Sequence, residues 1–490
     1  MNKSIKTNAI LNAIRQCVSI LYGIFTIPYV SRILGSEAYG KINFSTSLIS
    51  YFILIAGLGI STYAVREGAR LRNSPTLLQK FVNEVYTINV ITSIVSYVLL
   101  FLLCFSVTAL HRYNDIILVL SVQIIFITVG TDWINTIYED YLYTTLRITV
   151  VHIISFLILI LFVKKPEDYL IYALVVASNK VISNVINLFY IRRKYICPKL
   201  MWGANLNKHL SPLFVLFFNA LTISIYVDSD KTMLSFFISD TATGIYSVAV
   251  NIYVVVKTLV NAMVGVALPR LSRCLGENNR REYDSLVFKV FHALLMIVLP
   301  CSIGLFFLSD RIIIVLSGVE YLECVFALKI LSGSLVFGTI AYCITYAVMI
   351  PQKMEKQCFV ASVISALSNV LLNLVLIPVL SLNGAAITTL FSEIIVVCIS
   401  FGYCRELINI KKMFKGTMLL AFASIIVALL CIIIKTYISK VLLSIMVSFG
   451  VCAIVYFVLL FALKDCVFHP FIKNILDTYN KKSWLNGRPR

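Results

Sequence analysis

Four cationic residues stand well inside apolar stretches that are long enough to cross a membrane. They are Arg15, Lys180, Lys257 and Lys329. A charged side chain at the centre of a bilayer costs at least about 2.5–3.5 kcal/mol on insertion scales, so charges at this depth usually mark a functional site. Because arginine and lysine both bind phosphate and carboxylate groups, these residues predict an anionic ligand inside the membrane.

Asparagines share helical faces with three of these cations. The residues are Asn12 beside Arg15, Asn184 and Asn187 beside Lys180, and Asn261 beside Lys257. Spacings of three, four or seven residues place each group on one side of a helix. Such faces could enclose a hydrated cavity in which the asparagines bind hydroxyl groups of the ligand, or they could form hydrogen bonds between packed helices. The second explanation suits any single polar residue, whereas a whole stripe that carries a cation favours the cavity.

Acidic residues inside the apolar stretches are candidates for ion coupling or gating. Asp228, Asp230 and Lys231 cluster near the end of one stretch, Asp132 lies late in another, and Glu393 lies in the middle of a third. Asp230 and Lys231 could instead neutralise each other as a structural pair, an alternative that the sequence leaves open. The deep charges are basic overall, which again favours an anionic cargo.

Other polar residues have simpler explanations. Arg147 and Lys289 lie near the starts of stretches, where a long side chain can reach the interface, and Glu84 lies near an end where water can solvate it. His152 and His292 are isolated, so we expect structural roles. The thirteen cysteines show no disulfide or metal-binding spacing. The sequence has no nucleotide loop, zinc motif or catalytic elbow, and it predicts neither a cofactor nor an enzyme.

The composition of the chain indicates a membrane protein. The chain has 490 residues, of which 60% are hydrophobic and 13% charged, with a mean hydropathy of +0.92. Soluble proteins are about 45–50% apolar and about 25% charged. This composition excludes a soluble enzyme, a disordered protein and a DNA-binding factor, so the net charge of +19 does not indicate nucleic acid.

We predict an all-α integral membrane protein with about fourteen transmembrane helices, since a crossing needs about 20 residues. The expected spans are 8–30, 42–64, 82–105, 115–135, 145–163, 168–190, 212–234, 244–268, 286–308, 324–349, 357–378, 383–403, 417–434 and 441–463. Alternate loops differ in charge: one set of loops and termini holds 27 lysines and arginines and the other holds 8. The positive-inside rule therefore predicts that both termini are cytoplasmic.

Two segments have serine, acidic and glycine residues in a similar order, and this similarity suggests an internal repeat. Ser31–Gly40 follows the first expected helix, and Ser235–Gly244 follows the seventh, with an acidic residue inside each segment. We expect two lobes of six helices with the same orientation. The predicted organisation is an N-terminal lobe at 1–190, a basic cytoplasmic linker at 191–211, a C-terminal lobe at 212–403, two further helices at 404–463 and a cytoplasmic tail at 464–490.

This pattern resembles a known transporter family. Residues 28–40, 57–67, 230–249 and 269–272 carry the likeness, within a plan of six, six and two helices over roughly residues 5–465. They are similar to the bacterial polysaccharide transporters of the multidrug/oligosaccharidyl-lipid/polysaccharide exporter superfamily, and most similar to the Wzx-type flippases of O-antigen and capsule repeat units.

The resemblance implies a flippase that alternates access to a cationic central cavity. Its cargo would be an oligosaccharide linked to undecaprenyl pyrophosphate, moved to the outer leaflet of the bacterial inner membrane. The polysaccharide polymerase and the chain-length machinery would be its partners. A peptidoglycan-precursor flippase and a multidrug antiporter of the same superfamily remain alternatives. A membrane-embedded glycosyltransferase ranks last, because the longest outer loop, 309–323, is short.

Overall fold

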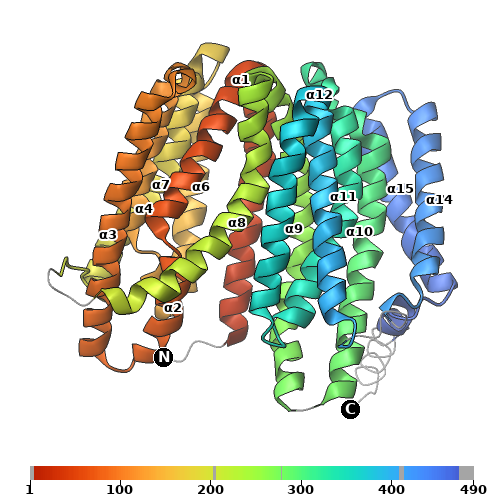
Figure 1. Ribbon diagram of the computed structural model, residues 1–490. Coiled ribbons are helices and arrows are strands. Elements are labelled where there is room, and N and C mark those ends of the chain that lie inside the picture. The colour runs from red at the N-terminus through yellow and green to blue at the C-terminus, as the bar shows by residue number, and fades with distance from the viewer. Residues whose placement is uncertain (1–4, 202–205, 278, 408–412, 474–490) are drawn as a thin grey trace, which may run out of the picture. The chain divides into compact units, whose positions relative to one another are not determined.

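The structure, a computed structural model, describes residues 5–201, 206–277, 279–407 and 413–473. Every regular element in these ranges is helical, and no strand occurs among them (Figure 1). A helix satisfies its backbone hydrogen bonds internally, which is the requirement for crossing a bilayer. The predicted class, an all-α integral membrane protein, is confirmed.

Contacts divide the chain into two compact units, Met1–Ser247 and Val248–Arg490. The first unit contains α1 (Ile5–Gly57), α2 (Ile60–Leu71), α3 (Pro75–Ser106), η1 (Thr108–Tyr113), α4 (Asn114–Gly130), α5 (Trp133–Ile137), α6 (Tyr141–Phe162), η2 (Pro166–Asp168), α7 (Tyr169–Lys194), α8 (Asn207–Phe237) and the start of α9 (Asp240–Gly276). The lobe and linker boundaries expected from the sequence stay predictions.

The second unit continues α9 and carries the remaining helices. These are α10 (Arg280–Leu316), η3 (Val319–Cys324), α11 (Val325–Cys343), η4 (Ile344–Met349), α12 (Glu355–Cys404), α14 (Thr417–Tyr437) and α15 (Val441–Ala462).

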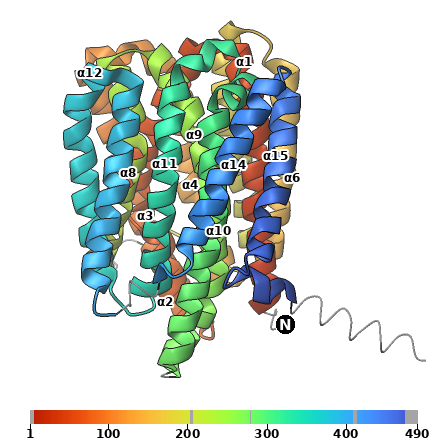
Figure 2. The same cartoon turned by 90° about the vertical axis from the view of Figure 1, so that its right-hand side faces the viewer.

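Twelve helical stretches among the described residues are long and apolar enough to cross a membrane. Two of them, Ile10–Leu71 and Glu355–Cys404, are interrupted by non-helical backbone at Gly35 and Ser381. A continuous helix of 62 residues would be about 90 Å long, three times the hydrocarbon thickness of about 30 Å, so the chain must turn back. Figure 2 shows α12 as two neighbouring rods. Counting the two halves of each interrupted stretch gives the fourteen spans predicted.

In α12, polar side chains are buried and large apolar side chains are exposed, which is the opposite of the arrangement in a soluble protein. Its polar Asn369 and Asn373 are fully buried, whereas Leu371 and Val375 are each 63% exposed. In lipid, leucine gains nothing from burial, and association depends on packing and on hydrogen bonds between helices. Polar side chains therefore face other helices, and large apolar side chains face outward.

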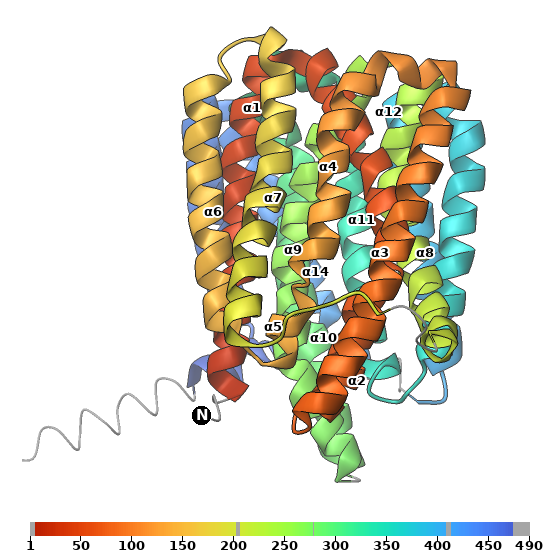
Figure 3. The same cartoon turned by 90° about the vertical axis from the view of Figure 1, so that its left-hand side faces the viewer.

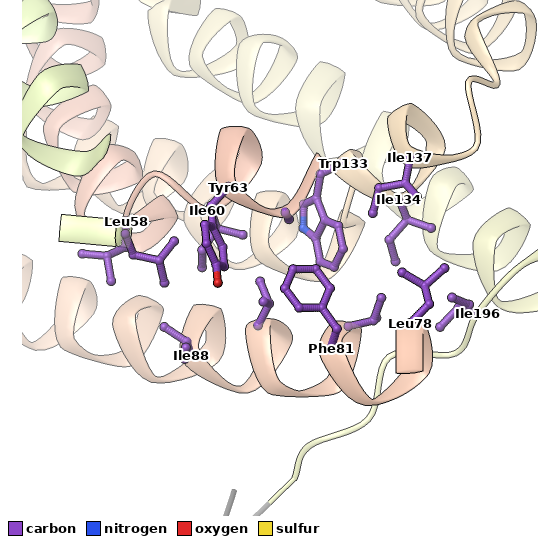
Figure 4. Close-up of a cluster of buried hydrophobic side chains, with 14 of the residues drawn as sticks. Leu58, Ile60, Tyr63, Leu78, Phe81, Ile88, Trp133, Ile134, Ile137 and Ile196 are labelled. Atoms are coloured by element: carbon purple, nitrogen blue, oxygen red, sulfur yellow. The ribbon is translucent and has the colours of Figure 1, made fainter. Parts of the chain in front are cut away.

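One apolar cluster holds the lower end of the first unit in Figure 1 together (Figure 4). Most of its members come from α2, α3 and α5, with others from α7, α8 and the segment between them, and they include Tyr63, Leu78, Phe81, Trp133 and Ile196. Figure 3 shows α2 and α5 at the same end of this unit. Tyr63 of this cluster also contacts His209, so the cluster adjoins the buried polar residues of the same unit.

Candidate functional site

An ion pair inside the second unit joins two residues that the sequence gave different roles. Lys257 of α9 contacts Oε1 of Glu393 of α12, and the hydroxyl of Tyr253 donates to the same oxygen at 3.0 Å. The Glu393 side chain is 5% exposed and that of Lys257 is 22% exposed. Pairing offsets much of the cost of holding either charge in the membrane interior. The sequence marked both residues, but only the fold shows that they are partners.

A glycine on a third helix leaves room for this pair. A Cβ atom at Gly338 of α11 would lie 2.7 Å from Oε1 of Glu393 and 2.9 Å from Nζ of Lys257. Any larger residue would therefore displace the charged groups. The helices α9, α11 and α12 together form a tightly fitted buried site for one cation and one carboxylate.

Lys329 and Asn261 are the other site residues predicted in the second unit, and their contacts differ from those of the ion pair. Lys329 of α11 stands over the ring of Phe306, 5.6 Å from its centroid, in a cation–π contact. Asn261 of α9 is buried, and its Oδ1 atom has no hydrogen-bond partner among the described residues. Asn261 thus keeps an acceptor free, one turn beyond Lys257.

In the first unit, the polar stripe of α7 divides into two parts. Asn187 is fully buried, where it accepts from Asn135 at 2.6 Å and donates to the carbonyl of Gly130 at 2.6 Å. Asn184 is also buried and donates to the carbonyl of Lys180. These contacts fasten α7 to α4 and α5. The Lys180 side chain, by contrast, is exposed.

Helices α1 and α7 both contact His152 of α6, a residue that looked isolated in the sequence. His152 of α6 has Nε2 3.4 Å from Oγ of Ser19 and Nδ1 3.0 Å from Nδ2 of Asn179. Its ring stacks on Tyr22, with centroids 4.4 Å apart. His152 looked isolated because its partners belong to other helices. On α1 itself, Arg15 donates to Oδ1 of Asn12 at 2.6 Å.

The acidic pair at the end of α8 faces two different helices. Asp228 accepts from Oγ of Ser50 at 2.9 Å, and the buried Asp230 accepts from the hydroxyl of Tyr246 at 2.9 Å. Asp228 therefore ties α8 to α1, whereas Asp230 ties it to α9. Lys231 follows directly and is half-buried.

Arg147 does not reach toward the interface as expected. Its side chain is 1% exposed, and its Nη2 atom pairs with Asp132 at 2.7 Å. Asp132 is 52% exposed, and it lies at the break between α4 and α5, where Thr131 adopts φ 44°. Reaching the interface was the wrong explanation, because the break brings an acidic partner back to the start of α6. Nε and Nη1 of Arg147 have no acceptor among the described residues.

Glu84 is likewise buried rather than solvated. It is 3% exposed and accepts from Nε2 of His209 at 2.9 Å and from Nζ of Lys208 at 2.8 Å. The other ring nitrogen of His209 lies 2.7 Å from the hydroxyl of Tyr63. The start of α8 supplies both basic partners, which lie 124 and 125 residues away along the chain.

In the same unit, Asp140 accepts three hydrogen bonds on one oxygen. The donors are the hydroxyls of Tyr190 and Tyr195, at 2.5 and 2.7 Å, and Nζ of Lys194 at 2.8 Å. Burial, together with the hydrogen bond to Asp140, raises the pKa of Tyr195 above its ordinary value, so the phenol stays protonated and donates. This network anchors the end of α7.

The two repeated segments of the sequence contact each other inside the first unit. A Cβ atom at Gly40 of α1 would overlap the carbonyl of Asp240, and one at Gly244 of α9 would overlap the carbonyl of Ser36. Each would also lie 2.9 Å from the backbone nitrogen of the other glycine. The contact is reciprocal between equivalent positions, so each segment needs its glycine for the same reason. Asp240 is held there by Tyr113 and Ser235.

Comparison with known proteins places the chain in a family. Residues 5–275, more than half of the chain, match the family described as polysaccharide biosynthesis protein. The chain belongs to this family. Two proteins named as candidate O-antigen transporters, from Shigella dysenteriae and Escherichia coli K12, are each 22% identical to it. The alignments cover 80% and 82% of this chain and 98% and 97% of those proteins.

More distant similarities agree with the fold. A protein named as a probable low-salt glycan biosynthesis flippase, from Haloferax volcanii, is 22% identical over 41% of this chain and 42% of its own length. The solved structure of the lipid II flippase MurJ, in an inward closed conformation, superposes with a TM-score of 0.78 at 18% identity. It covers 93% of this chain and 98% of that one. An inward-facing multidrug transporter of the MATE family gives 0.64 at 14% identity, covering 80% and 94%. The resemblance to polysaccharide flippases of this superfamily is confirmed.

Proposed function

We propose that the protein moves oligosaccharide repeat units linked to undecaprenyl pyrophosphate from the cytoplasmic to the outer leaflet of the bacterial inner membrane. The observation that carries this proposal is the presence of cations on polar helical faces of a polysaccharide-family membrane protein. A hydrated cavity lined by such faces would spare the sugar the loss of its hydration, while the lipid chain stays in the bilayer. Both termini would be cytoplasmic, and the polymerase would receive the product.

In the first unit, Arg15 and Lys180 are the candidates to bind the pyrophosphate. Neither forms an ion pair with another residue in the described part of the chain. Asn12 orients Arg15 through a hydrogen bond, and the exposed Lys180 keeps its charge for a ligand. A charge-assisted contact to phosphate is about twice as strong as a neutral hydrogen bond.

In the second unit, the Lys257–Glu393 pair supports a role in coupling. A phosphate that approaches Lys257 competes with Glu393 for the same ammonium group. The displaced carboxylate would then stand in the membrane interior without its partner, and uptake of a proton or a sodium ion would remove that cost. Anionic cargo and coupling ion would thus exchange at one pair. Lys329 and Asn261, on α11 and α9, would bind more distant parts of the glycan.

The remaining predicted residues suit positions in gating. Asp228, Asp230 and Lys231 connect α8 to α1 and α9, so breaking those contacts would free α8. Asp132 would act in the same way for α6 through Arg147. Asn187 bonds to α4 and α5, and Asn184 packs against Gly130 of α4, so we assign both to holding α7 in place rather than to touching the cargo.

Depletion of the protein in its host tests the cargo directly. Lipid extracts analysed by mass spectrometry should show accumulation of undecaprenyl-pyrophosphate-linked repeat units, and surface polysaccharide should disappear while the cells keep growing. Lysis with accumulation of the peptidoglycan precursor would favour the alternative flippase, which the MurJ-like fold makes a specific second candidate. Unchanged lipid-linked intermediates, with altered drug tolerance, would favour the multidrug antiporter.

Single charge-removing variants test the site. At equal protein levels, Arg15→Gln, Lys180→Gln and Lys257→Gln should each lower glycan export at least about tenfold, since loss of one charged hydrogen bond costs about 1.5–3 kcal/mol. Lys440→Gln, at an exposed position beside α15, is the matched control and should export normally. Normal export by all three membrane variants would contradict the cationic site.

A further inference from the structure

Three potential metal ligands converge in the second unit, away from the transport residues. His292 lies on α10, and Asp465 and Cys466 form the turn that follows α15. One ligand atom from each lies within 4.8 Å of the other two. His292 and Asp465 are 173 residues apart in the chain, so no sequence spacing could indicate this site.

The distances are close to those of a tetrahedral zinc site. Sγ of Cys466 lies 3.8 Å from Nε2 of His292, and Oδ2 of Asp465 lies 2.8 Å from the same nitrogen. With Zn–N near 2.0 Å and Zn–S near 2.3 Å, a nitrogen and a sulfur ligand stand about 3.6 Å apart. The separation of nitrogen and sulfur is thus close to what one ion requires, but Sγ also lies 4.0 Å from Nδ1, so the imidazole must turn to direct Nε2 toward the ion. The oxygen needs to move by about half an ångström.

Backbone amides fix the orientation of the Asp465 carboxylate. Oδ1 of Asp465 accepts from the amides of Val467 and Phe468 at 3.0 and 2.8 Å, which leaves Oδ2 to face the histidine. Hydrogen bonds of this kind orient the ligands of metal sites. The neighbouring Lys464 has φ 55°, so the turn is not part of a helix that would resist a small shift.

The site also has a way in. His292 and Asp465 have no side-chain exposure, whereas Cys466 is exposed. Gly416, at φ +85°, packs against the group: a Cβ atom there would lie 3.0 Å from Sγ of Cys466 and 3.2 Å from Cε1 of His292. The exposed thiol gives an ion access to the group, and the missing side chain at Gly416 avoids crowding the thiol and the imidazole.

We propose that His292, Asp465 and Cys466 bind one zinc ion, with water in the fourth position. A mixed nitrogen, oxygen and sulfur set in a small pocket suits this borderline-soft ion better than magnesium or calcium, which prefer oxygen ligands alone. The ion links the turn after α15 to α10 and so stabilises this end of the unit. The transport proposal is independent of this site.

Metal analysis of the full-length protein tests the assignment. The protein is purified in detergent with a tag that lacks histidine, and its zinc content and affinity are measured by mass spectrometry and by competition with a chelator. The wild type should hold about one zinc per chain at micromolar free zinc. EDTA should lower its unfolding temperature, and added zinc should restore it.

Matched cysteine variants decide between zinc and a simple hydrogen-bonded pair. Cys466→Ser should bind zinc at least about tenfold more weakly, because loss of even an outer partner costs that much. Its unfolding temperature should no longer respond to EDTA. Cys398→Ser removes another exposed thiol and should match the wild type. Absence of bound zinc in the wild type, or equal zinc affinity in Cys466→Ser and the wild type, would overturn the assignment.

Discussion

Among the described residues, each unit contains one buried histidine–carboxylate pair, and the two pairs differ in the groups that surround them. In the first unit, His209 and Glu84 stand 2.9 Å apart, and Tyr63 and Lys208 occupy the remaining positions around them. In the second, His292 and Asp465 stand 2.8 Å apart, with the thiol of Cys466 3.8 Å from the same ring nitrogen. A hard hydroxyl and an ammonium complete a hydrogen-bond network, whereas a thiol provides a ligand for a soft metal ion.

The difference implies that the same kind of pair belongs to a hydrogen-bond network in the first unit and to the proposed zinc site in the second. The network of the first unit joins α2, α3 and the start of α8, beside the apolar cluster of Tyr63 and Phe81 (Figure 4). All its partners are protein groups, so its stability should depend on each of them. The pair in the second unit should depend on zinc as well. The following substitutions test this contrast.

The largest effect is expected from His209→Ala. This change leaves the Tyr63 hydroxyl and one bond of Glu84 unsatisfied, each at a cost of about 1–3 kcal/mol, so the free energy of unfolding should fall by about 3 kcal/mol. Thermal unfolding in detergent, followed by the fraction of protein that stays monodisperse, measures it. Tyr63→Phe should lose about a third as much. A stable His209→Ala protein would show that the network is dispensable.

An intermediate effect is expected from Gly416→Ala in the second unit. The left-handed backbone at φ +85° costs a residue with a Cβ atom about 1–2 kcal/mol, and the methyl group crowds the thiol and the imidazole. The unfolding temperature should fall, and zinc affinity should fall with it. Gly402→Ala is a control, because a Cβ atom there meets nothing within 4 Å. Unchanged zinc affinity in Gly416→Ala would separate the glycine from the metal site.

The smallest effect is expected from Lys208→Gln. Its side chain is 50% exposed, and exposed ion pairs contribute about 0–1 kcal/mol because water and salt screen them. Unfolding measured at low and high salt should show a small difference that disappears at high salt. A loss as large as that of His209→Ala would mean that the ammonium, rather than the imidazole, holds the Glu84 network together.

Much of the fold could be predicted because lipid imposes simple rules. Length and hydropathy gave the helices, and the interruptions at Gly35 and Ser381 correspond to the short gaps between predicted spans. The segments ending in Gly40 and Gly244 were also visible as a repeat, although not as a contact. Arg147 and Glu84 were misjudged, because the position of a residue along a helix does not say which face meets a partner.

The site was predicted as separate residues rather than as pairs. The sequence identified Lys257 and Glu393 as candidates because each is a charge in an apolar stretch. It left His152 as an isolated residue, because the polar partners of His152 lie on α1 and α7. A single charged or polar residue is recognisable because its cost in lipid is high wherever it lies. Its partner is not, because residues 136 positions apart meet only when their helices pack.

The sequence by itself therefore determined the solvent, the number of crossings and the presence of costly intramembrane charges. These properties follow from transfer free energies that each residue carries with it. The tertiary structure alone decided which charges neutralise one another and which remain available to a ligand. Lys257 pairs with Glu393, whereas Arg15 donates to the neutral Asn12 and forms no ion pair with a described residue. Electrostatic energy depends on distance, and only the packing of the helices sets the distance.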